Sequence, residues 1–177
     1  MKSLHAYALS GAIIASVATW GFLQFPGLLI WCAFISWATF LHSGGTRDKI
    51  PATLLCLFFG TIMAWIFALC VTSKLVIMPL PIMSALLVAI LAPLMILASK
   101  FALFSVVPAT FYGFATSFAY LAQTPGKFTL EAITSIGWEN VLIVVTVSLC
   151  IGVALGYLQT ISAASLIASS RPEAEAA

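Results

Sequence analysis

Residues 140–170, NVLIVVTVSLCIGVALGYLQTISAASLIASS, contain no Lys, Arg, Asp or Glu. Four more uncharged stretches, 3–46, 50–73, 75–99 and 101–126, precede them in the chain. A helix that crosses about 30 Å of hydrocarbon needs about 20 mostly apolar residues. Each of the four shorter stretches therefore holds one membrane span, and the longest, 3–46, has room for two.

The pattern predicts an all-α integral membrane protein with six transmembrane helices. We expect the spans at about 5–24, 27–43, 51–73, 79–98, 101–122 and 140–161. They would form one transmembrane domain over 1–162, followed by a short cytoplasmic tail over 163–177. The composition agrees, because 63% of the residues are hydrophobic and 7% charged, whereas soluble domains carry about a quarter charged residues. The lipid bilayer is therefore the expected surrounding of the chain.

The first span has an alternative interpretation as a secretory signal. Lys2 precedes its apolar stretch, and Ser16-Val17-Ala18 fits a cleavage pattern. The apolar stretch continues to Phe25, and Trp20 lies where an interfacial aromatic residue would. A retained helix is therefore favoured.

The basic residues predict how the chain is oriented. With six spans, both termini and the loops after the second and fourth spans lie on one side of the membrane. The two sides carry five and two basic residues, namely Lys2, Arg47, Lys49, Lys100 and Arg171 against Lys74 and Lys127. By the positive-inside rule both termini are cytoplasmic, and we expect the protein in the bacterial inner membrane.

Several classes of function are disfavoured. The four cysteines show no metal-binding or disulfide spacing, and the chain has no protease, hydrolase or phosphate-loop motif, so we expect no metal, no cofactor and no enzyme activity. The net charge of +2 is too small to indicate a nucleic-acid partner. No Asp, Glu, Lys or Arg falls at the centre of a predicted span, which disfavours an ion-coupled site.

The two halves of the chain show a faint internal repeat. Ala38-Thr39 recurs as Ala115-Thr116, and on that alignment Phe34, Trp37 and Leu41 correspond to Phe111, Phe114 and Phe118. Small residues four apart, which let helices approach closely, occur in the third span as Gly60 and Ala64 and in the sixth as Gly152 and Gly156. Halves of three spans would be inverted repeats, as in many transporters. Chance similarity between apolar helices remains an alternative.

Hydroxyl groups gather on one face of the second and fifth spans. A transport hypothesis makes these faces a narrow pathway with a backbone break at Pro108 and Gly113. The alternative is that the hydroxyls satisfy the carbonyls of their own helices and merely pack the spans together. The pathway-lining candidates are Ser36, Thr39, Thr110, Tyr112, Thr116 and Ser117.

Polar residues at span ends are candidates for the mouths of such a pathway. His42 and Ser43 would lie at the cytoplasmic end of the second span. Glu139 and Asn140 would lie at the outer start of the sixth span, where they could instead serve the helix N-terminus.

Two stretches carry a family resemblance. The run from Trp37-Ala38-Thr39-Phe40 to Ser43-Gly44-Gly45, and the run from Pro108 to Gly113 with Phe118, resemble the YcdZ-like group of small uncharacterised bacterial inner-membrane proteins. Where that group has glycine before the threonine of the second motif, this chain has Ala109. The resemblance implies a fold and a location, but no substrate.

A fainter likeness covers residues 31–60, with Trp31, a glycine-containing loop with Arg47, and Gly60. It is similar to one membrane half of the fusaric-acid-resistance exporters of aromatic acids. That likeness implies efflux of an organic anion.

Two hypotheses of function follow. The first is a channel or facilitator for a small neutral or weakly polar solute, or a small organic anion, assembled as a homo-oligomer. The second is a membrane scaffold or partner subunit that transports nothing.

Overall fold

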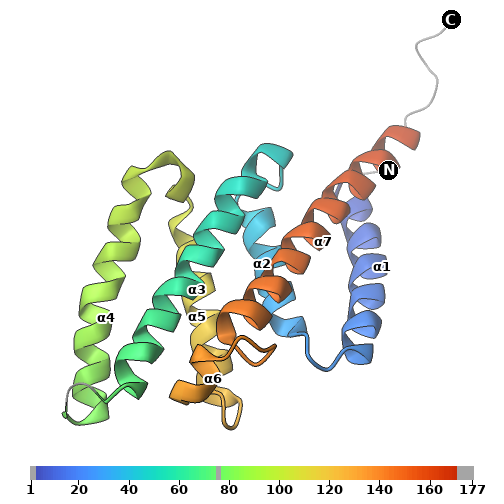
Figure 1. Ribbon diagram of the computed structural model, residues 1–177. Helices are drawn as coiled ribbons and strands as arrows, with labels where there is room; N and C mark the ends of the chain where they lie inside the picture. Colours follow the sequence, from blue (N-terminus) through green and yellow to red (C-terminus); the bar gives the residue numbers. More distant parts are fainter. Residues whose placement is uncertain (1–2, 75–76, 171–177) are drawn as a thin grey trace, which may run out of the picture.

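The computed structural model describes residues 3–74 and 77–170, and every regular element within them is a helix (Figure 1). The predicted all-α class is therefore confirmed. Lys2, Arg171 and the tail beyond residue 170 lie outside the described residues. The main helices are α1 (Ser3–Gln24), α2 (Ile30–His42), α3 (Ile50–Thr72), α4 (Leu80–Leu97), α5 (Val107–Gln123), α6 (Leu130–Thr134) and α7 (Val141–Ser169). Short 3-10 turns are η1 (Arg47–Lys49), η2 (Ala98–Lys100) and η3 (Ala102–Phe104).

Four helical segments are long and apolar enough to cross a membrane: Ser3–Gln24, Arg47–Thr72, Leu80–Lys100 and Val141–Ser169. The protein is thus a membrane protein by the length and composition of its helices. The other two predicted spans correspond to α2, with 13 residues, and α5, with 17 residues. At 1.5 Å per residue they are about 20 Å and about 26 Å long, so the six crossings stay a prediction.

The six longer helices run alternately in opposite directions (Figure 1). The start of α1 and the end of α7 therefore lie at the same end of the molecule, which is the upper end in the figure. The end of α2, η1 and the α4–α5 connection lie at this end as well. The turn between α1 and α2 and the short helix α6 lie at the opposite end.

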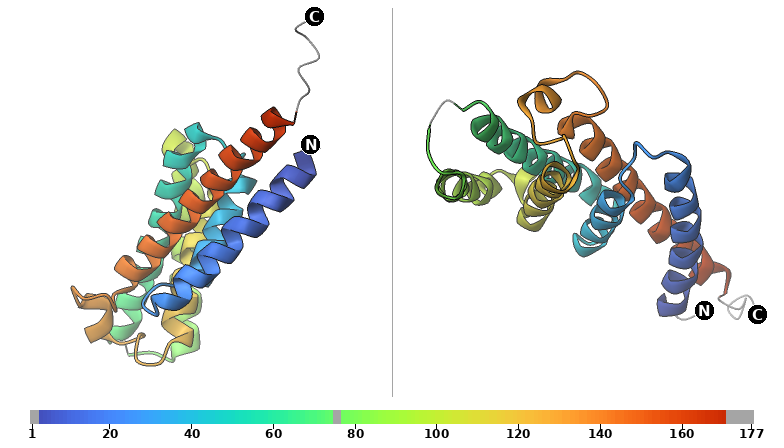
Figure 2. Two further views of the ribbon diagram at one scale, coloured as in Figure 1. Left: turned by 90° about the vertical axis from the view of Figure 1, so that its right-hand side faces the viewer. Right: turned by 90° about the horizontal axis from the view of Figure 1, so that it is seen from below.

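The helices form an elongated layer and do not close into a ring (Figure 2). Helices α1 and α4 lie at the two extremes of this layer, and most of their surface is exposed. The most extensive packing joins α3 to α5 and α2 to α7, while α1 packs on α7 and α4 on α3. Each of α1, α2 and α3 therefore packs mainly on a helix from later in the chain. The core lies at the centre of the layer.

Helix ends follow from local sequence. Pro51, Pro81 and Pro108 each stand in the first turn of a helix, where the missing N–H costs no hydrogen bond. Helix α2 stops at Gly44 and Gly45, which both have positive φ. The N–H of Gly45 donates to the carbonyl of Phe40 at 3.0 Å, which is the backbone hydrogen bond of a helix that ends in glycine.

Two helix boundaries differ from the sequence-based expectation. The span expected over 101–122 is not one helix, because η3 precedes α5, which begins only at Val107. Helix α7 continues to Ser169, so residues 163–169 are helical where a tail was expected. The loop between α5 and α7 contains the short helix α6, which Thr129 caps by accepting a hydrogen bond from the N–H of Ala132.

Candidate functional site

A groove between α2 and α5 brings three of the predicted site residues together. Its volume is about 250 Å³, and Thr39, His42 and Tyr112 line it with Ile35 and Ala38. Thr39 is buried, whereas His42 is exposed and Tyr112 is 44% exposed. The groove lies near His42, the last residue of α2. The first residues of α1 and the last residues of α7 lie at this same end of the molecule. We name this groove the α2/α5 groove.

The other lining candidates are buried between helices. Ser36, Thr110, Thr116 and Ser117 are each no more than 2% exposed. The hydroxyl of Ser36 donates to the carbonyl of Ala33, and the hydroxyl of Ser117 donates to the carbonyl of Gly113. Within a single chain these groups therefore act as packing residues.

The threonine hydroxyls among the lining candidates behave in the same way with one exception. Thr39 donates to the carbonyl of Ile35 at 2.6 Å, and Thr116 donates to that of Tyr112 at 2.7 Å. Both bonds return to the preceding turn of the same helix. The hydroxyl of Thr110 is buried without a hydrogen-bond partner in the part of the chain that the structure describes.

The backbone break expected at Pro108 and Gly113 has a different form. Pro108 lies in the first turn of α5, and the helix is interrupted just before it, between η3 and Val107. Gly113 lies inside α5, where a Cβ would overlap the carbonyl oxygen of Leu57 on α3. Gly113 is therefore a site of close helix contact and not of a break.

The small residues of α3 and α7 lie at the two main helix contacts. A Cβ at Gly60 would overlap the carbonyl oxygen of Thr110 on α5. A Cβ at Gly152 would overlap the carbonyl oxygen of Ala33 on α2, and Gly156 lies against Trp37. Ala64 is fully buried one turn after Gly60. Backbones approach here as closely as glycine permits.

The candidates at the span ends have structural partners. Ser43 donates from its hydroxyl to the carbonyl of Thr39 at 2.8 Å. Asn140 is the N-cap of α7, because its side-chain oxygen accepts a hydrogen bond from the N–H of Leu142 at 2.8 Å. The structure thus places Asn140 in the capping role that was one of its two predicted interpretations.

Glu139 is paired with a base outside the helices. Its carboxylate lies 2.8 Å from the Lys127 ammonium. The hydrogen bond and the charge of Lys127 lower the pKa of Glu139, and the same hydrogen bond raises the pKa of Lys127. The pair ties the two ends of the loop that contains α6.

A buried amide was missed in the sequence. Gln159 on α7 accepts a hydrogen bond from the indole N–H of Trp37 at 2.7 Å and donates to the carbonyl of Tyr7 at 3.0 Å. It therefore joins α1, α2 and α7 at one point. A single glutamine in an apolar helix is a signal of such a contact, although its partners lie far away in the chain.

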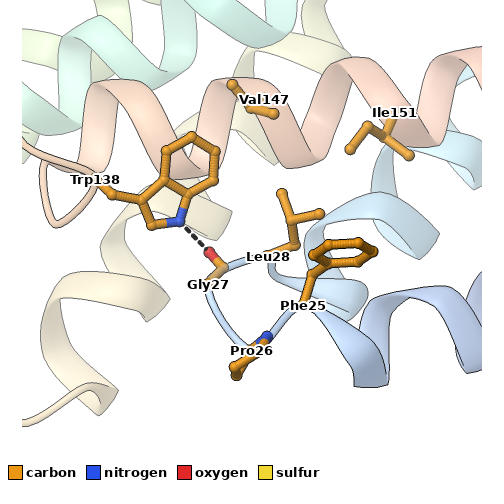
Figure 3. A pocket seen from close by; sticks show the side chains of 7 residues that line it. All are labelled: Phe25, Pro26, Gly27, Leu28, Trp138, Val147 and Ile151. Atoms are coloured by element: carbon orange, nitrogen blue, oxygen red, sulfur yellow. Dashed lines mark hydrogen bonds between the residues drawn. The ribbon is translucent and has the colours of Figure 1, made fainter.

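Trp138 was missed as well, and it borders a second groove (Figure 3). Its indole N–H donates to the carbonyl of Gly27 at 2.6 Å, which links the loop before α7 to the turn between α1 and α2. The groove has a volume of about 410 Å³. We call it the Trp138 groove, and its lining residues are Phe25, Pro26, Gly27, Leu28, Trp138, Val147 and Ile151.

Among the described residues, no group of three or more His, Cys, Asp or Glu side chains comes close enough to hold a metal ion. The α2/α5 groove offers the Tyr112 hydroxyl and the His42 imidazole as hydrogen-bonding groups beside an apolar wall formed by Ile35 and Ala38.

Comparison with known proteins identifies a family. The family model described as "Protein of unknown function (DUF1097)" matches residues 8–164. No curated protein matches the chain, and no solved structure matches it. The matched region includes α2, α3, α5 and most of α7, and hence both helix contacts and both grooves. The chain therefore belongs to the DUF1097 family of proteins of unknown function.

Proposed function

We propose that this protein is a bacterial inner-membrane channel or facilitator for a small neutral or weakly polar solute, and that the α2/α5 groove is the cytoplasmic entrance of its path. The observation that carries the proposal is that the groove brings the exposed side chains of His42 and Tyr112, from two helices, together with the buried Thr39. A hydrogen-bonding cluster beside apolar walls is the usual construction of a small-molecule site.

The chain would cross the membrane six times as two inverted halves, α1 to α3 and α4 to α7. The alternating directions of the helices support this arrangement, because α1, α2 and α3 run opposite to α4, α5 and α7 respectively (Figure 1). The helix pairing supports it as well, because the contact of α2 with α7 corresponds to the contact of α5 with α3.

The glycine contacts support the same correspondence at single residues. On the alignment of Ala38 with Ala115, Ala33 corresponds to Thr110. Gly152 meets the carbonyl of Ala33, and Gly60 meets the carbonyl of Thr110. Two helix pairs from different parts of the chain therefore share one mode of contact, which chance similarity between apolar helices does not predict.

The path would run along the outside of a single chain, on the face that α2 and α5 present. The hydroxyls of Ser36, Thr39, Thr116 and Ser117 are bonded to their own helices, and the helices form an elongated layer and not a closed ring (Figure 2). Two or more copies that face one another across α2 and α5 would enclose a path. Transport by this protein therefore requires a homo-oligomer.

The solute would be uncharged or weakly polar. The α2/α5 groove has no Asp, Glu, Lys or Arg in its lining. An ion in the groove would therefore find no opposite charge to pair with, and an unpaired charge inside a membrane is costly. A small organic anion, which the exporter resemblance implies, would have to rely on His42 and on hydroxyl donors.

A scaffold or partner subunit is the second candidate. The observation that favours it is the large exposed apolar surface of α1 and α4, where Trp20, Leu86 and Ile90 are each more than half exposed. Such surface faces either lipid or the helices of another protein.

Flux measurements on proteoliposomes test the proposal. We expect faster swelling than in protein-free liposomes with at least one member of a panel of neutral solutes and small organic anions. Tyr112→Phe and His42→Ala should lower that flux several-fold, and Ala38→Trp, which fills the groove, should abolish it.

Two control variants make the result specific. Tyr7→Phe removes a phenol from α1 outside the groove, and Ala154→Trp adds an indole to an exposed position of α7; both should leave the flux unchanged. If no solute of the panel crosses faster than in protein-free liposomes, the facilitator is rejected and the scaffold remains. If flux occurs but all three groove variants conduct as well as wild type, the path lies elsewhere.

A further inference from the structure

We propose that the Trp138 groove binds one acyl chain of a membrane phospholipid. The proposal rests on the arrangement of the chain as two inverted halves across the membrane, and it concerns the end of the molecule opposite the α2/α5 groove. Its three supports are the fixed walls of the groove, the apolar lining, and the side chain that fills the corresponding place in the other half.

The walls of the groove are held in place by the chain itself. The hydrogen bond from Trp138 to the carbonyl of Gly27 fixes the indole ring over the turn between α1 and α2 (Figure 3). A Cβ at Gly27 would come within 2.5 Å of the indole nitrogen, so a larger residue there would displace the indole from this position. The groove is therefore a preformed feature and not a gap that a side chain of the turn can close.

The lining selects a hydrocarbon ligand. The side chains of Phe25, Leu28, Val147 and Ile151 are apolar, and the indole N–H of Trp138 is already bonded to Gly27. A water molecule needs two to four polar partners to be held in such a place. An apolar groove in a membrane protein is consequently filled by the apolar component of its surroundings, which is the lipid tail.

The other half of the chain shows an apolar ring at the corresponding position. On the alignments of Ala38 with Ala115 and of Gly60 with Gly152, Gly27 corresponds to Phe104 and Ile151 to Phe59. The rings of Phe104 and Phe59 pack edge to face with their centroids 5.1 Å apart. Where the second half has Phe104, whose ring packs on Phe59 of α3, the first half has Gly27 and leaves the space beside Ile151 open to a separate occupant.

The depth of the groove suits an acyl chain of the outer leaflet. Val147 and Ile151 follow the first residue of α7, Val141, by roughly 9 Å and 15 Å along the helix axis, so the floor extends from the helix start towards the hydrocarbon. Trp138, which is 45% exposed, stands at the rim, as tryptophan does at membrane interfaces. A lipid tail can enter beside the indole and lie along α7.

Photo-cross-linking with a phospholipid that carries a diazirine on its acyl chain tests the proposal. The purified protein is reconstituted with this lipid, irradiated and digested, and the adducts are located by mass spectrometry. We expect several-fold more adducts on 25–28 and 147–151 than on Leu86 and Ile90 of α4, which are exposed apolar residues outside any groove described above. Ile151→Phe, which introduces the ring that Phe59 supplies in the other half, should lower the yield in the groove several-fold.

Leu158→Phe is the matched control, because Leu158 is an exposed residue of α7 on the same side as Val147 and Ile151, about two turns further on. It should leave the yield unchanged. The proposal would be overturned if adducts in the groove were no more frequent than on α4. It would also be overturned if the yield of adducts in the groove were the same in Ile151→Phe as in the wild type. With a photoreactive amino acid at Ile151 in place of the photoreactive lipid, cross-links to a second copy of the chain would overturn it too, since the occupant would then be protein. None of these outcomes depends on solute flux, so the facilitator is tested separately.

Discussion

Gly60 lies directly against the backbone of Thr110, whose carbonyl oxygen occupies the place that a Cβ at residue 60 would take. Gly152 lies in the same way against Ala33. These two contacts join α3 to α5 and α7 to α2, and they hold the centre of the helix layer together. Each contact pairs a helix of one half with a helix of the other half. The two halves therefore pack on each other at the centre of the molecule.

Substitution at the glycine contacts is expected to destabilise the protein. Gly60→Ala and Gly152→Ala would each force two helix backbones apart, and overpacking of this kind costs roughly 1–3 kcal/mol. Gly21→Ala is the control, because nothing lies within 4 Å of a Cβ at residue 21. Thermal unfolding in detergent measures the effect. Equal stability of Gly60→Ala and Gly21→Ala would show that the close contact does not exist.

Loss of the Gln159 amide is expected to loosen α1. Gln159→Leu leaves the buried indole N–H of Trp37 without its acceptor, and hydrogen bonds between membrane helices are worth about 0.6–2 kcal/mol. Hydrogen exchange in residues 3–24 should become faster while exchange in α3 is unchanged. Because the same bond is lost in both cases, adding Trp37→Phe to Gln159→Leu should cost less than Trp37→Phe costs in the wild-type protein. Strictly additive losses would mean that the two side chains do not interact.

Removal of the Asn140 side chain is expected to free the loop before α7. Asn140 accepts from the N–H of Leu142 and donates to the carbonyls of Ile133 and Ser135. Loss of an N-cap alone typically costs about 1 kcal/mol of stability. Because Asn140→Ala loses all three hydrogen bonds, we expect it to cost more than that. Limited proteolysis should cleave the variant within residues 124–139 faster than the wild type. Thr134→Ala, which alters an exposed hydroxyl of α6, is the control and should be cleaved at the wild-type rate.

The ion pair of Lys127 and Glu139 predicts a pH dependence of the same loop. The pKa of Glu139 is lowered by Lys127, so the pair stabilises the loop above the ordinary glutamate pKa of about 4.3 and loses this effect as the pH falls through the lowered value. The pKa of Lys127 is raised, so its contribution persists up to the ordinary lysine pKa of about 10.4 and is lost as the pH rises through the raised value.

Hydrogen exchange of residues 124–138, corrected for the intrinsic effect of pH, measures this dependence. Glu139→Gln should exchange faster than the wild type at neutral pH, and the difference should shrink in acid as the wild-type carboxylate becomes protonated. A difference that stays constant into acid would mean that the charge of Glu139 is not the cause.

Much of the fold could be predicted from the sequence, because charges mark where the chain leaves the hydrocarbon. The gaps between Lys49, Lys74 and Lys100 bracket α3 and α4 closely. The start of α5 could not be placed in this way, because residues 101–106 contain no charged residue but form η3 and an irregular segment. Pro108 was the available signal, since proline is favoured in the first turn of a helix and not at its centre.

The site was harder to predict than the fold. Thr39, His42 and Tyr112 were candidates from their residue types, and their meeting in one groove depends on how α2 and α5 cross. Hydroxyl periodicity cannot distinguish Tyr112, which is exposed, from Thr110, which is buried. The bonds of Trp37 and Trp138 join residues 122 and 111 positions apart, and no local pattern encodes such a separation.

Sided labelling of single cysteines tests most directly whether the chain crosses the membrane six times as two inverted halves. Cysteines at Gln24, Thr46, Ser99 and Pro125, each in a variant that lacks the four native cysteines, are labelled in intact cells with a reagent that does not cross the inner membrane. We predict that positions 24 and 125 react from outside and positions 46 and 99 only after the membrane is opened. Labelling of 24 and 46 from the same side, or of 99 and 125 from the same side, would show that α2 or α5 does not cross, and would contradict the six-span arrangement.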